Sequence, residues 1–174
     1  MHSALNFNPY LEKFVCSYTK EPYFLKQITK TIGLCKCCPF PGRPLLVEYN
    51  FATMNEDHIF YKQESHGLSK YKNILPVWGL NDDYFSDVGN TRIYNNHRLS
   101  DKLKIEIAWK NEASKPSGSF KDRGLSVGIA LAHLLGAKQV WLPTQGNAGI
   151  AASLFSTRLG LEKALVYMPV SHRD

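Results

Sequence analysis

The sequence predicts an α/β fold in which helices flank a parallel β-sheet. Three short segments with the apolar pattern of strands alternate with two segments of helical periodicity between residues 104 and 170. A glycine, Gly136 or Gly160, closes each helical segment, as is common at helix ends. Because strands separated by helices usually pair in parallel, this order favours a parallel sheet over a set of hairpins.

The three predicted strands are short and apolar. "KIEIAWKNE" at 104–112 alternates apolar and polar residues, as a strand with one buried face does. "KQVWLPT" at 138–144 is an apolar run typical of a buried strand, and "KALVYMPV" at 163–170 supplies the third. We expect all three to lie side by side in one sheet.

The two predicted helices connect these strands. "SFKDRGLSVGIALAHLLGA" at 119–137 spaces its apolar residues three or four apart, at Leu125, Ile129, Ala132 and Leu135. "QGNAGIAASLFSTRLG" at 145–160 predicts the second helix. In an α/β domain such helices begin at the carboxyl ends of the strands, where ligands bind.

The chain before residue 104 has a different texture. Residues 1–50 hold all four cysteines and the proline-rich turn "CCPFPGRP". Residues 51–103 are polar and aromatic, with turn signals such as "NDD" and "VGN" and a short helix expected at "LSKYKNILP". We therefore divide the chain into an N-terminal segment, 1–50, the N-terminal part of a large domain, 51–103, and an α/β region, 104–174.

Composition restricts the classes of protein to which this chain can belong. Hydrophobic residues make up 44% and charged residues 21%, which is typical of a globular protein. No apolar run approaches the roughly 20 residues of a membrane helix, and the first residues lack a signal pattern, so a cytoplasmic protein without a membrane partner is expected. The net charge of +6 fits either a solvated basic surface or anionic ligands. Nucleic acid is not an expected partner, because long Lys and Arg runs and known binding motifs are missing.

Two loops carry the candidate chemistry. "KPSGSFKDRG" at 115–124 places Lys121 in the first turn of the first helix, where the positive end of the helix dipole favours a neutral, nucleophilic amine. Taken alone, Lys121 is better explained as a surface lysine in a helix cap. "PTQGNAG" at 143–149 opens the second helix with small residues, whose backbone amides suit an anion.

Together the two loops resemble those of the threonine synthases, fold type II enzymes that depend on pyridoxal 5'-phosphate. "NEASKPSGSFKDRG" is similar to the family's "NPTGSFKDRG" motif, and "PTQGNAGIAASLFSTRLG" to its "SGNAG" loop and following helix. "GNTRIYNNHRL" and "LSKYKNILPV" are similar to its "EGNTPLxxxxxL" and "RYxxLLPV" segments, and the resemblance runs from about Cys16 to the last residue. It implies a tryptophan synthase β-like fold, with a parallel sheet and flanking helices.

The resemblance also implies roles for individual residues. Lys121 matches the lysine that holds the cofactor as a Schiff base and, once released, acts as a base at the substrate α-carbon. Asn147 matches the asparagine that hydrogen-bonds the ring oxygen of the cofactor. The loop that receives the substrate α-carboxylate corresponds to Thr144, Gln145, Gly146 and Ala148, with Gln145 in place of the usual serine or alanine. Ser119 is a candidate contact to the substrate or to its phosphate.

The implied reaction converts O-phospho-L-homoserine and water to L-threonine and phosphate, so the chain is expected to be a lyase of amino-acid biosynthesis. Another fold type II enzyme, such as a cysteate synthase or a threonine dehydratase, shares both motifs. A third alternative is a half-enzyme without catalysis that serves as an interaction module. The small-molecule substrate is the expected partner in the first two cases.

The chain is much shorter than the enzymes it resembles. A later glycine-rich loop for the cofactor phosphate and a Ser or Thr partner for the pyridine nitrogen are both missing from the sequence. We therefore expect the N-terminal half of such an enzyme, in the form of a truncated chain, a split subunit or a prematurely ended reading frame. Its expected protein partner is a separate C-terminal half or a second copy of the chain.

The cysteines resemble an incomplete zinc ribbon. "CSYT" at 16–19 and "CKCC" at 35–38 occupy the places of two C-x-x-C pairs, but Thr19 stands where a fourth cysteine is needed. Cys16, Cys35 and Cys38 would supply three thiolates, with Cys37 in reserve. Because structural zinc normally takes four protein ligands, we predict a degenerate ribbon that folds without metal.

Overall fold

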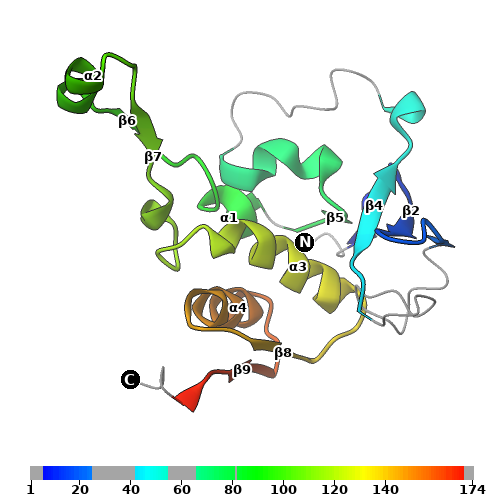
Figure 1. Cartoon of the computed structure of the whole chain (residues 1–174). Helices are drawn as coiled ribbons and strands as arrows, with labels where there is room; N and C mark the ends of the chain where they lie inside the picture. The colour runs from blue at the N-terminus through cyan, green and yellow to red at the C-terminus, as the bar shows by residue number, and fades with distance from the viewer. Residues whose placement is uncertain (1–5, 25–41, 55–65, 81, 171–174) are drawn as a thin grey trace.

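The computed structural model describes residues 6–24, 42–54, 66–80 and 82–170. Figure 1 shows three parts: an antiparallel sheet near the N-terminus, a central group of helices, and a projecting arm. No helix of this described part is long and apolar enough to cross a membrane.

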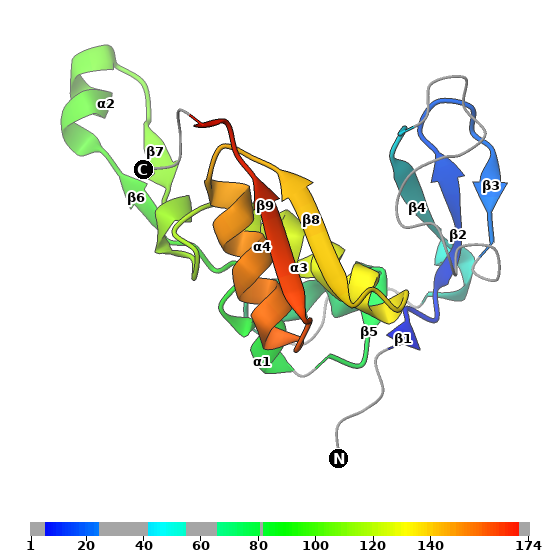
Figure 2. The same cartoon turned by 90° about the horizontal axis from the view of Figure 1, so that it is seen from below.

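The C-terminal part has the α/β arrangement that the sequence predicts. Strands β8 (Gln139–Pro143) and β9 (Lys163–Tyr167) pair in parallel, and helix α4 (Asn147–Arg158) connects them. Helix α3 (Lys121–Leu134) precedes β8 and packs beside α4. Both helices cover the same face of the strand pair (Figure 2). The predicted helices and the last two strands are thus confirmed, each a few residues shorter than expected.

The two faces of the β8–β9 pair differ in exposure. Val140 and Leu142 point toward the helices and pack against the main core. The alternate residues Trp141, Leu165 and Tyr167 are exposed, and the Trp141 side chain is 70% exposed. This alternation follows from the two-residue period of a strand, since a single layer of helices covers only one face.

The first predicted strand, 104–112, is wrong in extent and in pairing. Strand β7 covers Ala108–Lys110 alone and pairs antiparallel with β6 (Ile93–Asn95), not with β8. Helix α2 (His97–Leu103) connects β6 and β7 at the tip of the arm (Figure 1). The Asn96 side chain caps the N-terminus of α2, and Lys104 ends it in the left-handed conformation, with φ at 56°. The residues after Lys104 therefore turn back before a strand can begin.

The main core joins α3 and α4 to the segment before the arm. Ala151 and Phe155 of α4 meet Ile129 of α3, and the cluster extends to Tyr84 and Phe85 of α1 (Asp82–Ser86). The Tyr84 ring packs edge-on against Phe155, 5.7 Å between centroids. The "NDD" turn signal thus leads into α1. The helix expected at 68–76 is a 3₁₀ helix, η4 (Gly67–Ile74), which precedes β5 (Val77–Trp78).

The N-terminal sheet has strand order β3-β2-β4 and is antiparallel. Its strands are β2 (Leu11–Cys16), β3 (Pro22–Tyr23) and β4 (Leu45–Tyr49). The short strand β1 (Asn6–Phe7) pairs with β5 and ties this sheet to the centre. The 3₁₀ turns η2 (Phe51–Thr53) and η5 (Glu112–Ser114) complete the elements.

Only one of the four cysteines lies in the described residues. Cys16 ends β2 and is fully buried, and its Sγ accepts hydrogen bonds from the amides of Tyr18 and Thr19, at 3.4 and 3.3 Å. Cys35, Cys37 and Cys38 lie outside the described residues. The absence of zinc therefore stays a prediction.

Candidate functional site

The two loops that the sequence singles out open neighbouring helices at one edge of the strand pair. Helix α3 leads into the start of β8, and α4 leaves its end, so both helices run opposite to the strands. Since α3 and α4 pack side by side, their N-termini lie at the same edge, the carboxyl edge of β8 and β9. Lys121 and Asn147 are the first residues of the two helices. The fold therefore places both candidate residues at the edge where α/β domains bind ligands.

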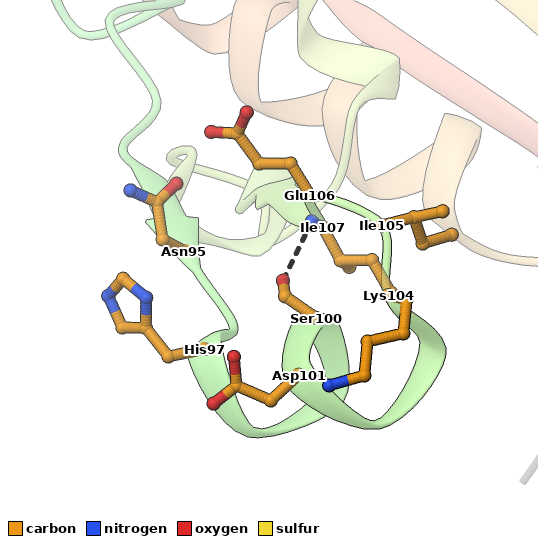
Figure 3. Close-up of a pocket in the computed structure, with 8 residues that line it drawn as sticks. All are labelled: Asn95, His97, Ser100, Asp101, Lys104, Ile105, Glu106 and Ile107. Carbon is orange, nitrogen blue, oxygen red and sulfur yellow. Dashed lines mark hydrogen bonds between the residues drawn. The ribbon is translucent and has the colours of Figure 1, made fainter.

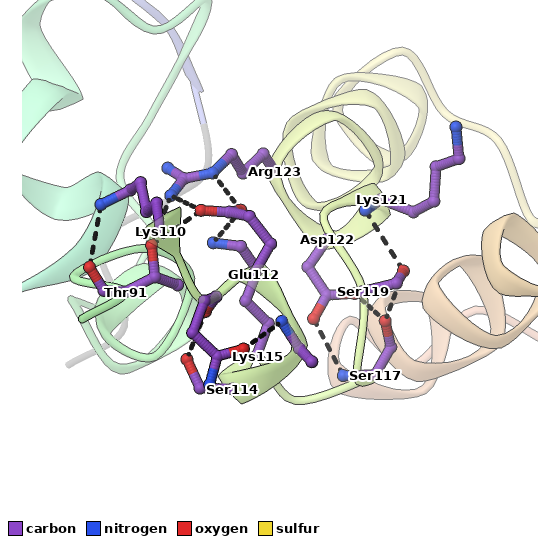
Figure 4. A network of polar contacts seen from close by, with 12 residues as sticks. Thr91, Lys110, Glu112, Ser114, Lys115, Ser117, Ser119, Lys121, Asp122 and Arg123 are labelled. Carbon is purple, nitrogen blue, oxygen red and sulfur yellow. Dashed lines mark hydrogen bonds and ion pairs between the residues drawn. The ribbon is translucent and has the colours of Figure 1, made fainter. Parts of the chain in front are cut away.

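The amine of Lys121 points away from the neighbouring polar side chains. Its side chain is half-buried, and Nζ lies 4.1 Å from the centroid of the exposed Phe120 ring. No hydrogen bond or ion pair joins this Nζ to the described residues, and Figure 4 shows the side chain extending away from the network behind it. An amine in this setting is accessible to a carbonyl reagent and is held over an apolar surface.

Asp122, the next residue, is fully buried and holds the loop that precedes α3. Its Oδ2 accepts the Ser117 amide at 2.9 Å, and its Oδ1 accepts the Ser117 hydroxyl in a shorter contact. The Ser119 hydroxyl lies 3.4 Å from that of Ser117 and accepts the Lys121 amide at 3.3 Å. Both serines of the motif thus bond within the protein, and Ser119 is itself buried.

Glu112 and Arg123 form a second network on the other side of the loop (Figure 4). Two guanidinium nitrogens of Arg123 donate to the two carboxylate oxygens of Glu112, each at 2.9 Å. Thr91 donates its hydroxyl to Glu112 at 2.7 Å, and Lys115 forms an ion pair with it at 3.0 Å. Lys110 donates to the backbone oxygen of Thr91 at 2.9 Å. The network joins the arm, the loop and the first turn of α3.

The charges in this network shift the acidity of its carboxyl group. The hydrogen bonds from Arg123 hold the pKa of Glu112 well below its ordinary range, against the opposing effect of burial, and Thr91 and Lys115 act in the same direction as Arg123. Glu112 in turn raises the pKa of Arg123. The buried ammonium of Lys115 depends on the same carboxylate, so Glu112 serves two cations at once.

The second loop, 144–148, brings backbone amides to the same edge. Gly146 has φ at 144°, a conformation that favours glycine, and no side chain caps the N-terminus of α4. The amides of Asn147 and Ala148 lie in the first turn, where no carbonyl of the helix is in reach. Thr144 Oγ1 accepts the Gly146 amide at 3.2 Å, and the Gln145 and Asn147 side chains are exposed. An anion is the natural occupant of such an uncapped end.

Gly149 has a role within the protein itself. A Cβ at this position would lie 2.8 Å from Val166 Cγ1 and 3.1 Å from Thr144 Cγ2. Because glycine has no side chain, α4 can lie close to β9 at this position.

A surface hollow on the arm is remote from these residues. It is lined by polar groups around α2, among them Asn95, His97, Asp101 and Glu106 (Figure 3). The Ile107 amide donates to Ser100 Oγ across it at 2.9 Å. Neither Lys121 nor Asn147 lines the hollow, so it is separate from the candidate site.

Sequence reasoning missed the residues that hold the lysine loop. Asp122 and Arg123 directly follow Lys121 in "KDRG", and that adjacency was the only signal in the sequence for either. Glu112 and Thr91 both lie in segments that resemble the family, but no sequence signal predicted their contact, because it joins residues 21 apart through the fold of the arm.

Comparisons with known proteins show the family of this chain. The profile of the family described as "Pyridoxal-phosphate dependent enzyme" matches residues 84–173, about half of the chain. Among curated proteins, the chain is 36% identical over 146 residues to the threonine synthase of Methanocaldococcus jannaschii, covering 82% of this chain and 35% of that protein. It is 32% identical to the threonine synthase of Methanosarcina acetivorans over 66% of this chain and 28% of that protein. The chain thus spans about a third of the length of the curated relatives it matches.

Proposed function

Because the chain belongs to the pyridoxal-phosphate dependent enzyme family, we propose that Lys121 holds pyridoxal 5'-phosphate and that the protein acts as a threonine synthase-like lyase. The observation that carries this proposal is the amine of Lys121, which bonds to none of the described residues and stands at the carboxyl edge of the β8–β9 pair. The uncapped N-terminus of α4 lies at the same edge.

The residues present fit the cofactor by their chemistry. A half-buried primary amine matches an aldehyde, and the exposed Asn147 amide can donate to a ring oxygen. When bound, the cofactor supplies an electron sink for charge that develops at the α-carbon of an amino acid. The role of Lys121 is then to hold and later to move a proton at that carbon.

The loop that opens α4 is proposed to bind the substrate α-carboxylate. Thr144, Gln145, Gly146 and Ala148 surround an N-terminus whose amides and dipole favour an anion. Gln145 is exposed, and its side-chain amide can donate a hydrogen bond to a carboxylate.

The proposed substrate is O-phospho-L-homoserine, which reacts with water to give L-threonine and inorganic phosphate. The names of the matched relatives support this choice, and the basic chain, at +6, suits a substrate with phosphate and carboxylate groups. The test is an assay of the full-length protein loaded with cofactor. Threonine and phosphate should appear in equal amounts. Formation of neither, by a protein that demonstrably holds the cofactor, would overturn the proposed substrate.

The proposal extends to the domain organisation, the location and the partner of the protein. The three-stranded sheet in the described part of 1–50 supports a separate N-terminal unit of the degenerate-ribbon type, followed by 51–103 and the α/β region 104–174. We propose a cytoplasmic protein whose pocket is completed by a C-terminal half or by a second copy of the chain. The bare outer face of β8 and β9 supports the need for a further layer.

A further inference from the structure

The loop before α3 contains a chain of hydrogen bonds that ends on a buried carboxylate. Asp122 is 0% exposed, and no Lys, Arg or His of the described residues forms an ion pair with it. Its two oxygens are instead taken by one residue, since Oδ2 accepts the Ser117 amide and Oδ1 the Ser117 hydroxyl. The first turn of α3 adds a favourable dipole for this carboxylate.

The number of hydroxyl hydrogens fixes the direction of this series of hydrogen bonds, which we call the relay. A serine hydroxyl has a single hydrogen, and Ser117 gives its own to Asp122. In the 3.4 Å contact between Ser117 and Ser119, Ser119 must therefore be the donor. Ser119 then receives the Lys121 amide at 3.3 Å. Every donor points the same way, from Lys121 through Ser119 and Ser117 to Asp122, so each bond polarises the next.

We propose that Asp122 is a positioning residue that fixes the backbone of Lys121 through Ser117 and Ser119. Ser119 donates its only hydroxyl hydrogen to Ser117, so in this proposal it belongs to the relay and does not donate to a substrate phosphate. The N-cap residue of α3, Phe120, supplies no side-chain acceptor, and Ser119 provides one for the Lys121 amide. The relay thereby fixes the backbone from which the Lys121 side chain extends. The importance of this backbone position for cofactor binding rests on the proposed function, whereas the relay itself does not.

Replacing Asp122 by asparagine, its amide analogue, tests the direction of the relay. In Asp122→Asn the Nδ2 group must face the Ser117 hydroxyl, because the Ser117 backbone N–H can only donate. Ser117 then becomes an acceptor there and turns its hydrogen toward Ser119, which reverses the relay without changing its shape. Ser117→Ala removes the middle of the relay, and Ser117→Thr keeps the hydroxyl. Ser114→Ala is the matched control, since the exposed Ser114 hydroxyl donates only to the Asn111 backbone oxygen at 2.9 Å.

The experiment measures hydrogen exchange of the Lys121 amide by NMR in the full chain without cofactor. Ser117→Ala should speed this exchange by roughly tenfold, about the loss of one hydrogen bond, and Ser117→Thr should restore it. Asp122→Asn keeps the bond from the Lys121 amide to Ser119 and should change the exchange much less. Ser114→Ala should exchange as the wild type does. Equal exchange in Ser117→Ala and Ser114→Ala, or no restoration by threonine, would overturn the relay. Should Asp122→Asn not fold, the serine series decides the question alone.

A second readout separates the relay from the proposed function. Pyridoxal phosphate is added to each folded variant, trapped with borohydride, and located by peptide mass spectrometry. The initial rate of labelling at Lys121 should fall in Ser117→Ala and recover in Ser117→Thr. Wild-type protein that is labelled at other lysines and not at Lys121 would overturn the proposed role of Lys121 and leave the exchange result standing. Equal labelling rates in Ser117→Ala and wild type would show that the relay does not position the amine.

Discussion

Glu112 and Arg123 face each other across the lysine loop, joined by two parallel hydrogen bonds of 2.9 Å between guanidinium and carboxylate. Glu112 precedes the loop, and Arg123 lies in the first turn of α3, two residues after Lys121. The pair therefore fixes both ends of the loop, with the geometry in which arginine and a carboxylate bind most strongly. Lys115, inside the loop, adds its buried ammonium to the same carboxylate.

This pair predicts a pH dependence of folding. The pKa of Glu112 in the folded protein lies well below its ordinary value of 4.5, so its ionised form stabilises the fold above about pH 4.5, and this contribution is lost as the pH falls further. Glu112→Gln should lower the free energy of unfolding by about 1–3 kcal/mol at neutral pH and by progressively less below pH 4.5. Urea unfolding at a series of pH values measures this.

The control for this prediction is Glu106→Gln, a change at an exposed glutamate of the arm. It should leave the free energy of unfolding nearly unchanged at each pH. A deficit of Glu112→Gln that stays constant as the pH falls would contradict the assignment of the low pKa to this pair.

The close approach of α4 and β9 predicts opposite effects for two glycine substitutions. Gly149→Ala places a Cβ 2.8 Å from Val166 Cγ1, so it should destabilise the fold by about 1–3 kcal/mol despite the better helix propensity of alanine. Gly128→Ala in α3 meets no atom within 4 Å and should stabilise by up to about 1 kcal/mol. Denaturant unfolding compares the two. Val166→Ala should recover part of the Gly149→Ala loss, and equal effects at both glycines would exclude a packing role.

The helices of the α/β region could be predicted because their signals are local. Apolar spacing and the closing glycines located α3 and α4 to within a few residues. The strand predicted at 104–112 was wrong for a reason that the alternation of apolar and polar residues cannot show. Its alternation is real, but the Asn96 cap and the left-handed Lys104 place a helix and a turn before it, and β7 finds its partner in β6.

The two loops of the candidate site could be located from their motifs, whereas the contacts that hold them could not. Lys121 and Asn147 stand at helix starts, as expected, and their roles stay predictions. The function of Asp122 depends on complete burial and on the fold of a six-residue loop, which no spacing rule gives. The same holds for Gly149, whose neighbour Val166 belongs to the next strand. The pattern also left open which face of these strands is covered: Val140 and Leu142 pack against the core, whereas Trp141 and Tyr167 are exposed.

The bare face of the strand pair predicts association of the isolated chain. Trp141 and Tyr167 pack edge-on there, 5.8 Å between ring centroids, and both are mostly exposed beside Leu165. An exposed apolar patch of this kind drives association as concentration rises. The double variant Trp141→Gln, Tyr167→Gln should sediment closer to a monomer and keep its free energy of unfolding to within about 0.5 kcal/mol.

Sedimentation velocity over a range of concentrations measures this, with Tyr18→Gln as the control. Tyr18 is comparably exposed but lies on the N-terminal side, next to Arg43. Its replacement should leave association unchanged. Association that persists in the double variant would assign the contact to another surface.

The last prediction concerns the choice among three neighbouring lysines. Lys115 is buried and paired with Glu112, and Lys110 donates to the Thr91 backbone oxygen, whereas Lys121 contacts only the Phe120 ring through its amine. Reaction of Lys110 or Lys115 with an aldehyde would break these bonds, and for Lys115 it would leave the Glu112 network short of a cation. Borohydride reduction of the full-length protein with pyridoxal phosphate should therefore label Lys121 alone. Lys121→Ala should abolish the label and leave the urea midpoint nearly unchanged, because its amine supports no described contact except the exposed ring. Label on Lys110 or Lys115 in the wild type would show that the amine at the start of α3 is not the reactive one.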